Sequence, residues 1–156
     1  MFSKKRQAGI FGKKKSVKIS NADKWFSRYK RLQDVFTVVG DTPYAKCFTC
    51  GKIEDVKKMQ CGHFIPRNRY NLRFNEKNAH AQCARCNEVE KGNLVVYMKR
   101  LDEVYGTGTA QELQDIGSMQ GAQKKLGSLY LRELAKEYNK KTRDLEKFLG
   151  IYKYFD

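Results

Sequence analysis

Apolar residues recur at three- and four-residue spacing after residue 20, which places them on one face of a helix: Trp25, Tyr29, Leu32 and Phe36. Ser20 and Asn21 precede the first of them, and both residue types are favoured at helix N-caps. The segment 40–43 contains Gly40 and Pro43, which interrupt helices. The pattern therefore predicts one amphipathic helix that begins near residue 20 and ends at residues 40–43.

The periodicity is lost in the middle of the chain and returns after it. In residues 43–74 the apolar pattern is irregular and broken by many turn residues, with one short strand-like piece at residues 63–65. Residues 84–104 are expected to be partly helical, because an apolar face follows Gly92: Leu94, Tyr97, Met98 and Leu101. A turn at residues 105–108 and a second short helix at 109–116 follow.

The last predicted helix covers residues 123–148. Its apolar stripe is opposed by Lys and Arg on the other face, and consists of Leu126, Leu129, Tyr130, Leu134, Tyr138 and Leu145. A chain of 156 residues is long enough for one domain with a core. We expect an α+β unit in three parts: a basic arm at 1–19, a central region at 20–108 and a C-terminal helical region at 109–156.

Charge indicates the kind of partner. The chain has 32 Lys and Arg against 17 acidic residues, a formal charge of +15, which is typical of proteins that bind a polyanion. Residues 1–19 hold seven basic residues and no acid, with Gly9 and Gly12 among them, and predict a flexible arm that contacts phosphates. A membrane surface is the competing polyanion, but no apolar run approaches the roughly 20 residues that span a bilayer. We therefore expect a cytoplasmic protein that binds nucleic acid.

Four of the five cysteines form two CxxC pairs, Cys47 with Cys50 and Cys83 with Cys86. Four thiolates at this spacing are the ligand set of a tetrahedral structural zinc site. The alternative is that they are small buried core residues, which is less compatible with two pairs in one short chain. The 32 residues between the pairs exceed the loop of a simple zinc ribbon, so a further unit should fold between them. Cys61 remains unpaired.

The residues between and after the pairs carry a family resemblance. Residues 61–67 read CGHFIPR and residues 83–87 read CARCN. A His followed by apolar residues and Pro, an Asn in the next loop and a CxxC-Asn element resemble the motif of HNH (ββα-metal) endonucleases. Residues 73–97, RFNEKNAHAQCARCNEVEKGNLVVY, resemble the phage NinG (Rap) family of recombination nucleases. The CxxC-Asn element followed by Glu90 is also similar to phage endonuclease VII, a Holliday-junction resolvase. The likeness covers roughly residues 20–115.

The resemblance implies a zinc-bound ββα-metal core, similar to a treble clef, flanked by N- and C-terminal helices. It implies an endonuclease that uses Mg²⁺ or Mn²⁺ on branched DNA such as Holliday junctions and D-loops. His63 is the expected base, because an imidazole near pKa 6.5 is mostly neutral at pH 7 and can accept a proton. Asn78 would orient the His63 loop, and Asn87 would be an oxygen ligand of the catalytic cation. Arg67, four residues after His63, is the candidate clamp on the phosphate.

The chain departs from the HNH pattern at Gly62, where most members have Asp or His. Asp55 and Glu90 are the carboxylates that could supply the missing metal ligand, and Glu90 is favoured because it follows Asn87 by three residues on a helix. His80 is an alternative ligand or base, and equally a packed imidazole beside the zinc cysteines. Asn87 could instead cap the helix that follows.

Residues 57–100 contain ten basic residues against three acids, with Tyr70 and Phe74 among them. Some of these cations should contact phosphates rather than form a solvated face: Arg67, Arg69, Arg73, Lys77, Arg85 and Lys91. Two other functions fit the same features, a non-catalytic zinc module that binds nucleic acid and a nicking HNH enzyme without branch preference. Resolving a junction needs two symmetric cuts, so a homodimer through the stripe of the last helix is also expected.

Overall fold

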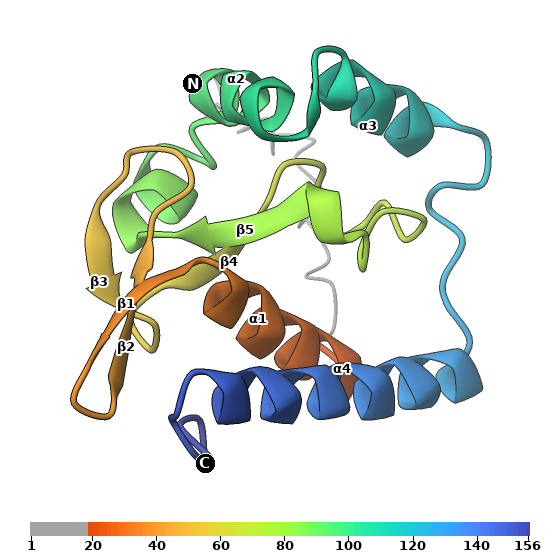
Figure 1. The fold of residues 1–156 in the computed structure, drawn as a ribbon. Coiled ribbons are helices and arrows are strands. Elements are labelled where there is room, and N and C mark those ends of the chain that lie inside the picture. Colours follow the sequence, from red (N-terminus) through yellow and green to blue (C-terminus); the bar gives the residue numbers. More distant parts are fainter. Residues whose placement is uncertain (1–18) are drawn as a thin grey trace, which may run out of the picture.

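The computed structural model describes residues 19–156, so residues 1–18 of the predicted arm lie outside the described part of the chain. Small sheets and helices are mixed along it, which confirms the α+β class (Figure 1). The elements are α1 (Asn21–Gln33), β1 (Val35–Val39), β2 (Thr42–Lys46), β3 (Ile53–Asp55), β4 (Gln60–His63), the 3₁₀ turn η1 (Glu76–Asn78), β5 (Ala79–Gln82), the π-helical turn η2 (Arg85–Val89), α2 (Leu94–Tyr105), α3 (Thr109–Ser118) and α4 (Ser128–Phe148).

Helix α1 begins where the sequence predicts and ends earlier. Ser20 is its N-cap and forms a reciprocal capping box with Asp23. The helix stops at Gln33, and the next residues form strand β1, which pairs antiparallel with β2. The predicted continuation of the helix to Phe36 is therefore wrong. Val-Phe-Thr-Val-Val favours a strand because β-branched and aromatic residues fit a pleated surface, and Phe36 is exposed on it.

Strands replace much of the irregular structure expected at residues 43–74. The sheet β1-β2-β3 is followed by a hairpin of β4 and β5, in which Gly62 pairs with His80 and His63 with Ala79. Strand β4 lies slightly before the strand-like piece predicted at 63–65. Because side chains alternate along a strand, Gln60 and Gly62 share one face of the hairpin, and Cys61 and His63 share the other.

Helices cover both faces of the β4-β5 hairpin (Figure 1). Helices α2 and α3 form where they were predicted and lie on one side, with Tyr97 and Leu101 buried against Phe64 and Leu72. Helix α1 lies on the other side, where Phe26 packs in a second cluster. Leu94 and Met98, expected on the same apolar face as Tyr97 and Leu101, are exposed. The β4-β5 hairpin sits between two helical layers.

Helix α4 starts at Ser128, five residues after the predicted start, and leaves Leu126 outside it. It lies alongside α1 (Figure 1), and Leu134 and Tyr138 are buried in the cluster that contains Phe26. Leu129 and Tyr130 are exposed. The buried part of the predicted stripe thus holds α4 to α1, and the homodimer through this stripe stays a prediction. None of the helices in residues 19–156 is long and apolar enough to cross a membrane.

Candidate metal centre and active site

Two turns bring the four paired cysteines together. Cys47 and Cys50 lie between β2 and β3, and Cys83 and Cys86 follow β5. The four Sγ atoms lie within 4.8 Å of one another, and those of Cys50 and Cys83 are 3.7 Å apart. A tetrahedral zinc ion with Zn–S bonds of about 2.3 Å places its sulfur ligands about 3.8 Å apart. The cluster can therefore hold a zinc ion, as the spacing of the cysteines predicted.

The first turn is shaped for this ligand set. The Gly51 N–H donates to the Cys47 carbonyl at 2.9 Å, and Gly51 has a φ of +76°, a conformation that glycine adopts without strain. Burial raises the pKa of Cys47, but hydrogen bonds from the Thr49 hydroxyl and from backbone N–H groups outweigh it and lower the pKa to about 6. Cys61 lies apart, packed near Phe26 in the α1–α4 cluster, and burial raises the pKa of its thiol to about 12. The fifth cysteine is a neutral thiol.

His63 ends strand β4 beneath helix α1. Its Nε2 lies 3.0 Å from the carbonyl oxygen of Arg73. A carbonyl only accepts hydrogen bonds, so Nε2 carries the proton and Nδ1 is the acceptor nitrogen. Burial lowers the pKa of His63 to about 4, and the charge of Arg67 acts in the same direction. His63 is therefore neutral at pH 7, with its proton on the nitrogen that faces the Arg73 carbonyl.

Asn78 holds the loop that orients His63. It is fully buried, and its Oδ1 accepts from the Ile65 N–H at 2.7 Å. Its Nδ2 donates to the carbonyls of Ile65 and Leu72 at 3.0 and 3.1 Å. Leu72 precedes Arg73, whose carbonyl meets His63. Asn78 thus ties residues 65 and 72 together, and its role as an orienter of the His63 loop stays a prediction.

Asn87 lies inside the π-helical turn η2 and not at a helix N-cap. Its Nδ2 donates to Gln60 Oε1 at 2.6 Å, and Gln60 Nε2 donates to Glu88 Oε1. These three side chains gather amide and carboxylate oxygens next to Cys86. Gln60 and Glu88 belong to no motif of the sequence. Gln60 could have been found from the alternation of side chains along β4, which places it on the same face as Gly62.

The two carboxylates proposed to replace the ligand at Gly62 lie elsewhere. Glu90 accepts from Arg85 Nε at 2.8 Å. Asp55 accepts from the Tyr154 hydroxyl at 2.6 Å and from the Lys57 N–H. The preference for Glu90 assumed an α-helix, whereas residues 85–89 form a π-helical turn with more residues per turn. A ligand role for Glu90 or Asp55 stays a prediction.

The side chain of Gln82 explains why position 62 is a glycine. A Cβ at this position would lie 1.9 Å from Gln82 Oε1, so no side chain fits without moving Gln82. The Gln82 amide is fixed by hydrogen bonds to Thr49 Oγ1 at 3.1 Å and to the Gly92 carbonyl at 2.9 Å, while its Oε1 is buried without a partner among the described residues. Gln82 therefore fills the space that an Asp or His at position 62 would need.

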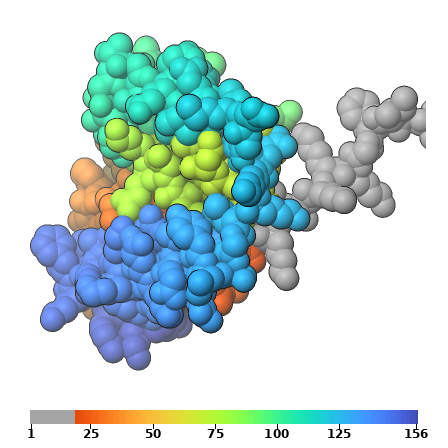
Figure 2. Space-filling view, turned by 90° about the vertical axis from the view of Figure 1, so that its right-hand side faces the viewer, coloured from red at the N-terminus to blue at the C-terminus, as the bar shows by residue number. Residues whose placement is uncertain are grey.

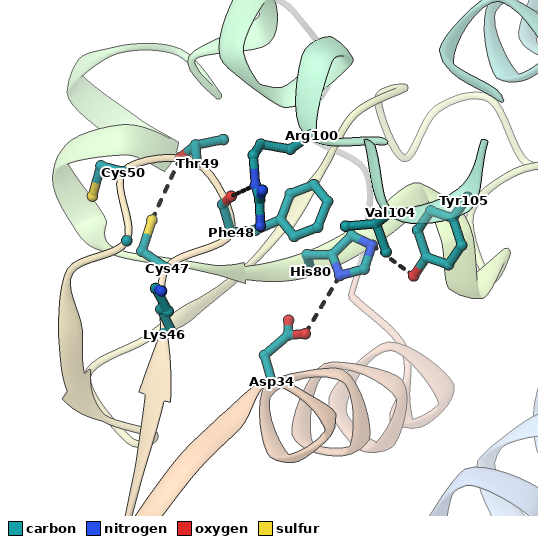
Figure 3. Close-up of a pocket in the computed structure, with 11 residues that line it drawn as sticks. Asp34, Lys46, Cys47, Phe48, Thr49, Cys50, His80, Arg100, Val104 and Tyr105 are labelled. Atoms are coloured by element: carbon teal, nitrogen blue, oxygen red, sulfur yellow. Dashed lines mark hydrogen bonds and ion pairs between the residues drawn. The ribbon is translucent and has the colours of Figure 1, made fainter. Parts of the chain in front are cut away.

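His80 lines an open pocket of about 500 Å³ next to the cysteines (Figure 3). It is 3% exposed and stacks on Phe48, with the ring centroids 3.8 Å apart. Its Nδ1 lies 3.5 Å from Asp34 Oδ1, and its Nε2 lies 3.1 Å from the Tyr105 hydroxyl. Both ring nitrogens thus face groups of this chain and not Asn87. Of the roles considered for His80, the packed imidazole is the one observed.

The basic residues around the site differ in availability. Arg67 is partly exposed and close enough to His63 to affect its pKa. Arg73 is buried, and its guanidinium donates to both carboxylate oxygens of Asp23 at 2.7 Å, which takes it out of the set expected to contact phosphates. Arg85 is exposed and pairs with Glu90. Lys77 and Lys91 are exposed, and Arg69 is partly exposed.

The fold and the cysteine cluster define an α+β protein with four cysteines that can hold a metal ion. The family model described as Bacteriophage Lambda NinG protein matches residues 3–148, and the chain belongs to this family. The ninG proteins of Salmonella phage P22 and Escherichia phage lambda are each 35% identical to it over 69 residues, 44% of this chain. That of Escherichia phage 933W is 33% identical over the same length. The aligned segment covers 34%, 33% and 34% of these relatives, about a third of each. No solved structure matches the chain.

Proposed function

We propose that this protein is an HNH-type, metal-dependent endonuclease that hydrolyses phosphodiesters in branched DNA. The observation that carries the proposal is the contact between His63 Nε2 and the Arg73 carbonyl, in a loop fixed by the buried Asn78. A general base needs a neutral acceptor nitrogen held in one orientation. His63 meets this requirement, since its proton lies on the Arg73 side.

In the proposed reaction, His63 Nδ1 accepts a proton from the attacking water. The water oxygen forms a bond to phosphorus, the bond from phosphorus to the 3′-oxygen breaks, and the leaving oxygen takes up a proton from solvent. Arg67 lies beside His63 and would hold a phosphate oxygen. Because His63 is uncharged at pH 7, it is free to accept this proton. For the same reason it adds nothing to the electrostatic attraction between protein and DNA.

Asn87, Gln60 and Glu88 would hold the catalytic cation. Mg²⁺ and Mn²⁺ prefer oxygen donors, and the two amides can present their oxygens by rotating half a turn. The cation would offset the charge that builds on the phosphate during hydrolysis. Cys86 precedes Asn87 directly, so the cysteine cluster fixes the backbone from which this ligand projects.

One observation favours a second function, a non-catalytic zinc module that binds nucleic acid. Gln82 occupies the space where HNH enzymes place a metal ligand, as it would if the cation site had been lost. The cationic surface and the cysteine cluster serve this function equally well. A measurement of DNA cleavage distinguishes this zinc module from the proposed endonuclease.

The zinc-loaded protein should be incubated with a labelled four-way junction and with linear duplex of the same sequence, in Mg²⁺, in Mn²⁺ or in chelator. We expect divalent-dependent strand breaks in the junction, and binding that weakens steeply with salt because phosphate contacts dominate. Zinc content is measured after chelation, so that loss of the fold is not mistaken for loss of the catalytic cation. No breaks with any divalent cation would favour the zinc module, and equal cutting of the duplex would remove the branch preference.

A further inference from the structure

The loop that orients His63 also forms one wall of a second pocket. This pocket has a volume of about 360 Å³ and lies between the loop and the beginning of α4, within the size range of sites for small ligands. Figure 2 shows this face, where the segment that joins α3 to α4 passes beside the loop. The aromatic residues that line it are Tyr70, Phe74, Tyr130 and Tyr138, and the amide residues are Asn71 and Asn75.

The lining combines flat apolar faces with amide edges. Tyr130 is 54% exposed and takes no part in the packing of α4 on α1. Asn75 Oδ1 accepts from the Lys77 N–H, and Asn71 Nδ2 donates to the Ile116 carbonyl. Within residues 19–156, this leaves the Asn75 amide N–H groups and the Asn71 carbonyl oxygen to pair with a ligand. Aromatic faces stack on any nucleobase, and amides pair with base edges.

Positive charge flanks the pocket. Lys124 and Lys125 are exposed and precede Leu126, which lines it. Arg69 is partly exposed and precedes Tyr70. The guanidinium of Arg73 lies over the Tyr70 ring, 5.3 Å from its centroid, with its charge neutralised by Asp23. The rim therefore suits a phosphate backbone, and the interior suits an uncharged planar group.

The pocket is next to the candidate active site. Phe26 contacts both, with its ring centroid 6.0 Å from that of His63 and 5.5 Å from that of Phe74. Arg73, whose carbonyl meets His63, is adjacent to Phe74 in the chain. A strand whose phosphate lies at His63 could therefore place a nearby base in the pocket.

We propose that this pocket binds an unpaired nucleobase of a branched DNA strand held at His63; the inference rests on the proposed function and adds a basis for its substrate preference. In continuous duplex every base is paired and stacked, and extracting one costs free energy, least where a base is already unpaired. Bulges and the displaced strand of a D-loop supply such bases. The pocket thus selects for unpaired structure rather than for sequence.

The test measures binding without cleavage. The zinc-loaded protein, without added divalent cation, is titrated with duplex DNA that contains one unpaired 2-aminopurine and with the fully paired duplex. We expect the bulged duplex to bind about tenfold more tightly, the typical effect of stacking one base on an aromatic side chain, and the 2-aminopurine fluorescence to be quenched. Tyr130→Ala should remove both effects and leave affinity for paired duplex unchanged, while Tyr130→Phe should retain them.

Tyr152→Ala is the matched control, because Tyr152 is also exposed, at 81%, and does not line the pocket. Equal binding of both duplexes by wild type, or the same preference in Tyr130→Ala, would overturn the proposal. So would an equal loss in Tyr152→Ala. A protein that prefers the bulge and cuts no DNA would disprove the nuclease and keep the pocket, whereas cutting without the preference would do the reverse.

Discussion

Replacing Cys83 with serine should unfold the central part of the chain and abolish zinc binding. Cys83 is buried, and the cluster joins the turn after β2 to the turn after β5 across 32 residues of sequence. Structural zinc sites contribute about 10–16 kcal/mol of apparent binding free energy in small domains, comparable to the whole stability of a typical protein, about 5–15 kcal/mol. Metal analysis and circular dichroism on heating measure the two effects.

Cys61→Ala is the matched control, because Cys61 is a partly buried cysteine outside the cluster. It should keep its zinc and lose only about 1 kcal/mol in the free energy of unfolding, the usual cost of a point substitution. If Cys83→Ser keeps one zinc ion per chain and unfolds like wild type, the four cysteines do not form a structural zinc site.

Replacing His63 should abolish strand cleavage and leave DNA binding nearly unchanged. Removal of a general base slows a reaction by about 10²–10⁴-fold. Burial lowers the pKa of His63 to about 4, so at pH 7 its imidazole adds no positive charge to the DNA-binding surface. Cleavage rates and binding titrations on the same junction measure the two effects separately.

The choice of variants keeps this result interpretable. His63→Ala leaves the Arg73 carbonyl without its donor and can weaken the loop, whereas His63→Gln retains an N–H group to meet that carbonyl. Both should lose cutting. His80→Gln alters the other histidine, which lies packed against Phe48, and should retain cutting. If His63→Gln cuts at the wild-type rate, His63 is structural and the base is another group.

Local signals predicted where elements begin, and pairing between distant residues decided where they end. The start of α1 follows from Ser20 and Asp23, neighbours that cap the helix by themselves. Its end does not, because Phe36 continues the helical spacing and becomes part of a strand only by pairing with β2. The start of α4 is the exception, because Leu126 fits the apolar spacing but lies before the helix, which begins at Ser128.

The candidate site divides in the same way. The cysteines could be recognised because a tetrahedral metal imposes their number and spacing. The partner of His63 could not be recognised from the sequence, because it is the backbone carbonyl of Arg73. Every residue has a backbone carbonyl, so the sequence does not single out this one. Gln82 fills the space beside Gly62 only through the register of β4 and β5. Glu90 was favoured on α-helical spacing, whereas the side chains that form hydrogen bonds next to Asn87 are those of Gln60 and Glu88.

The proposed nuclease depends most directly on a hard cation that binds beside the cysteine cluster at Asn87. Electron paramagnetic resonance of Mn²⁺ titrated into the zinc-loaded protein tests this, because the signal of the free ion falls as it binds. We predict a single Mn²⁺ per wild-type chain, affinity weakened about tenfold or more in Asn87→Ala with zinc retained, and no change in Asn68→Ala, an exposed asparagine used as the control. Wild-type Mn²⁺ affinity in Asn87→Ala, or no Mn²⁺ binding to the zinc-loaded protein, would contradict it.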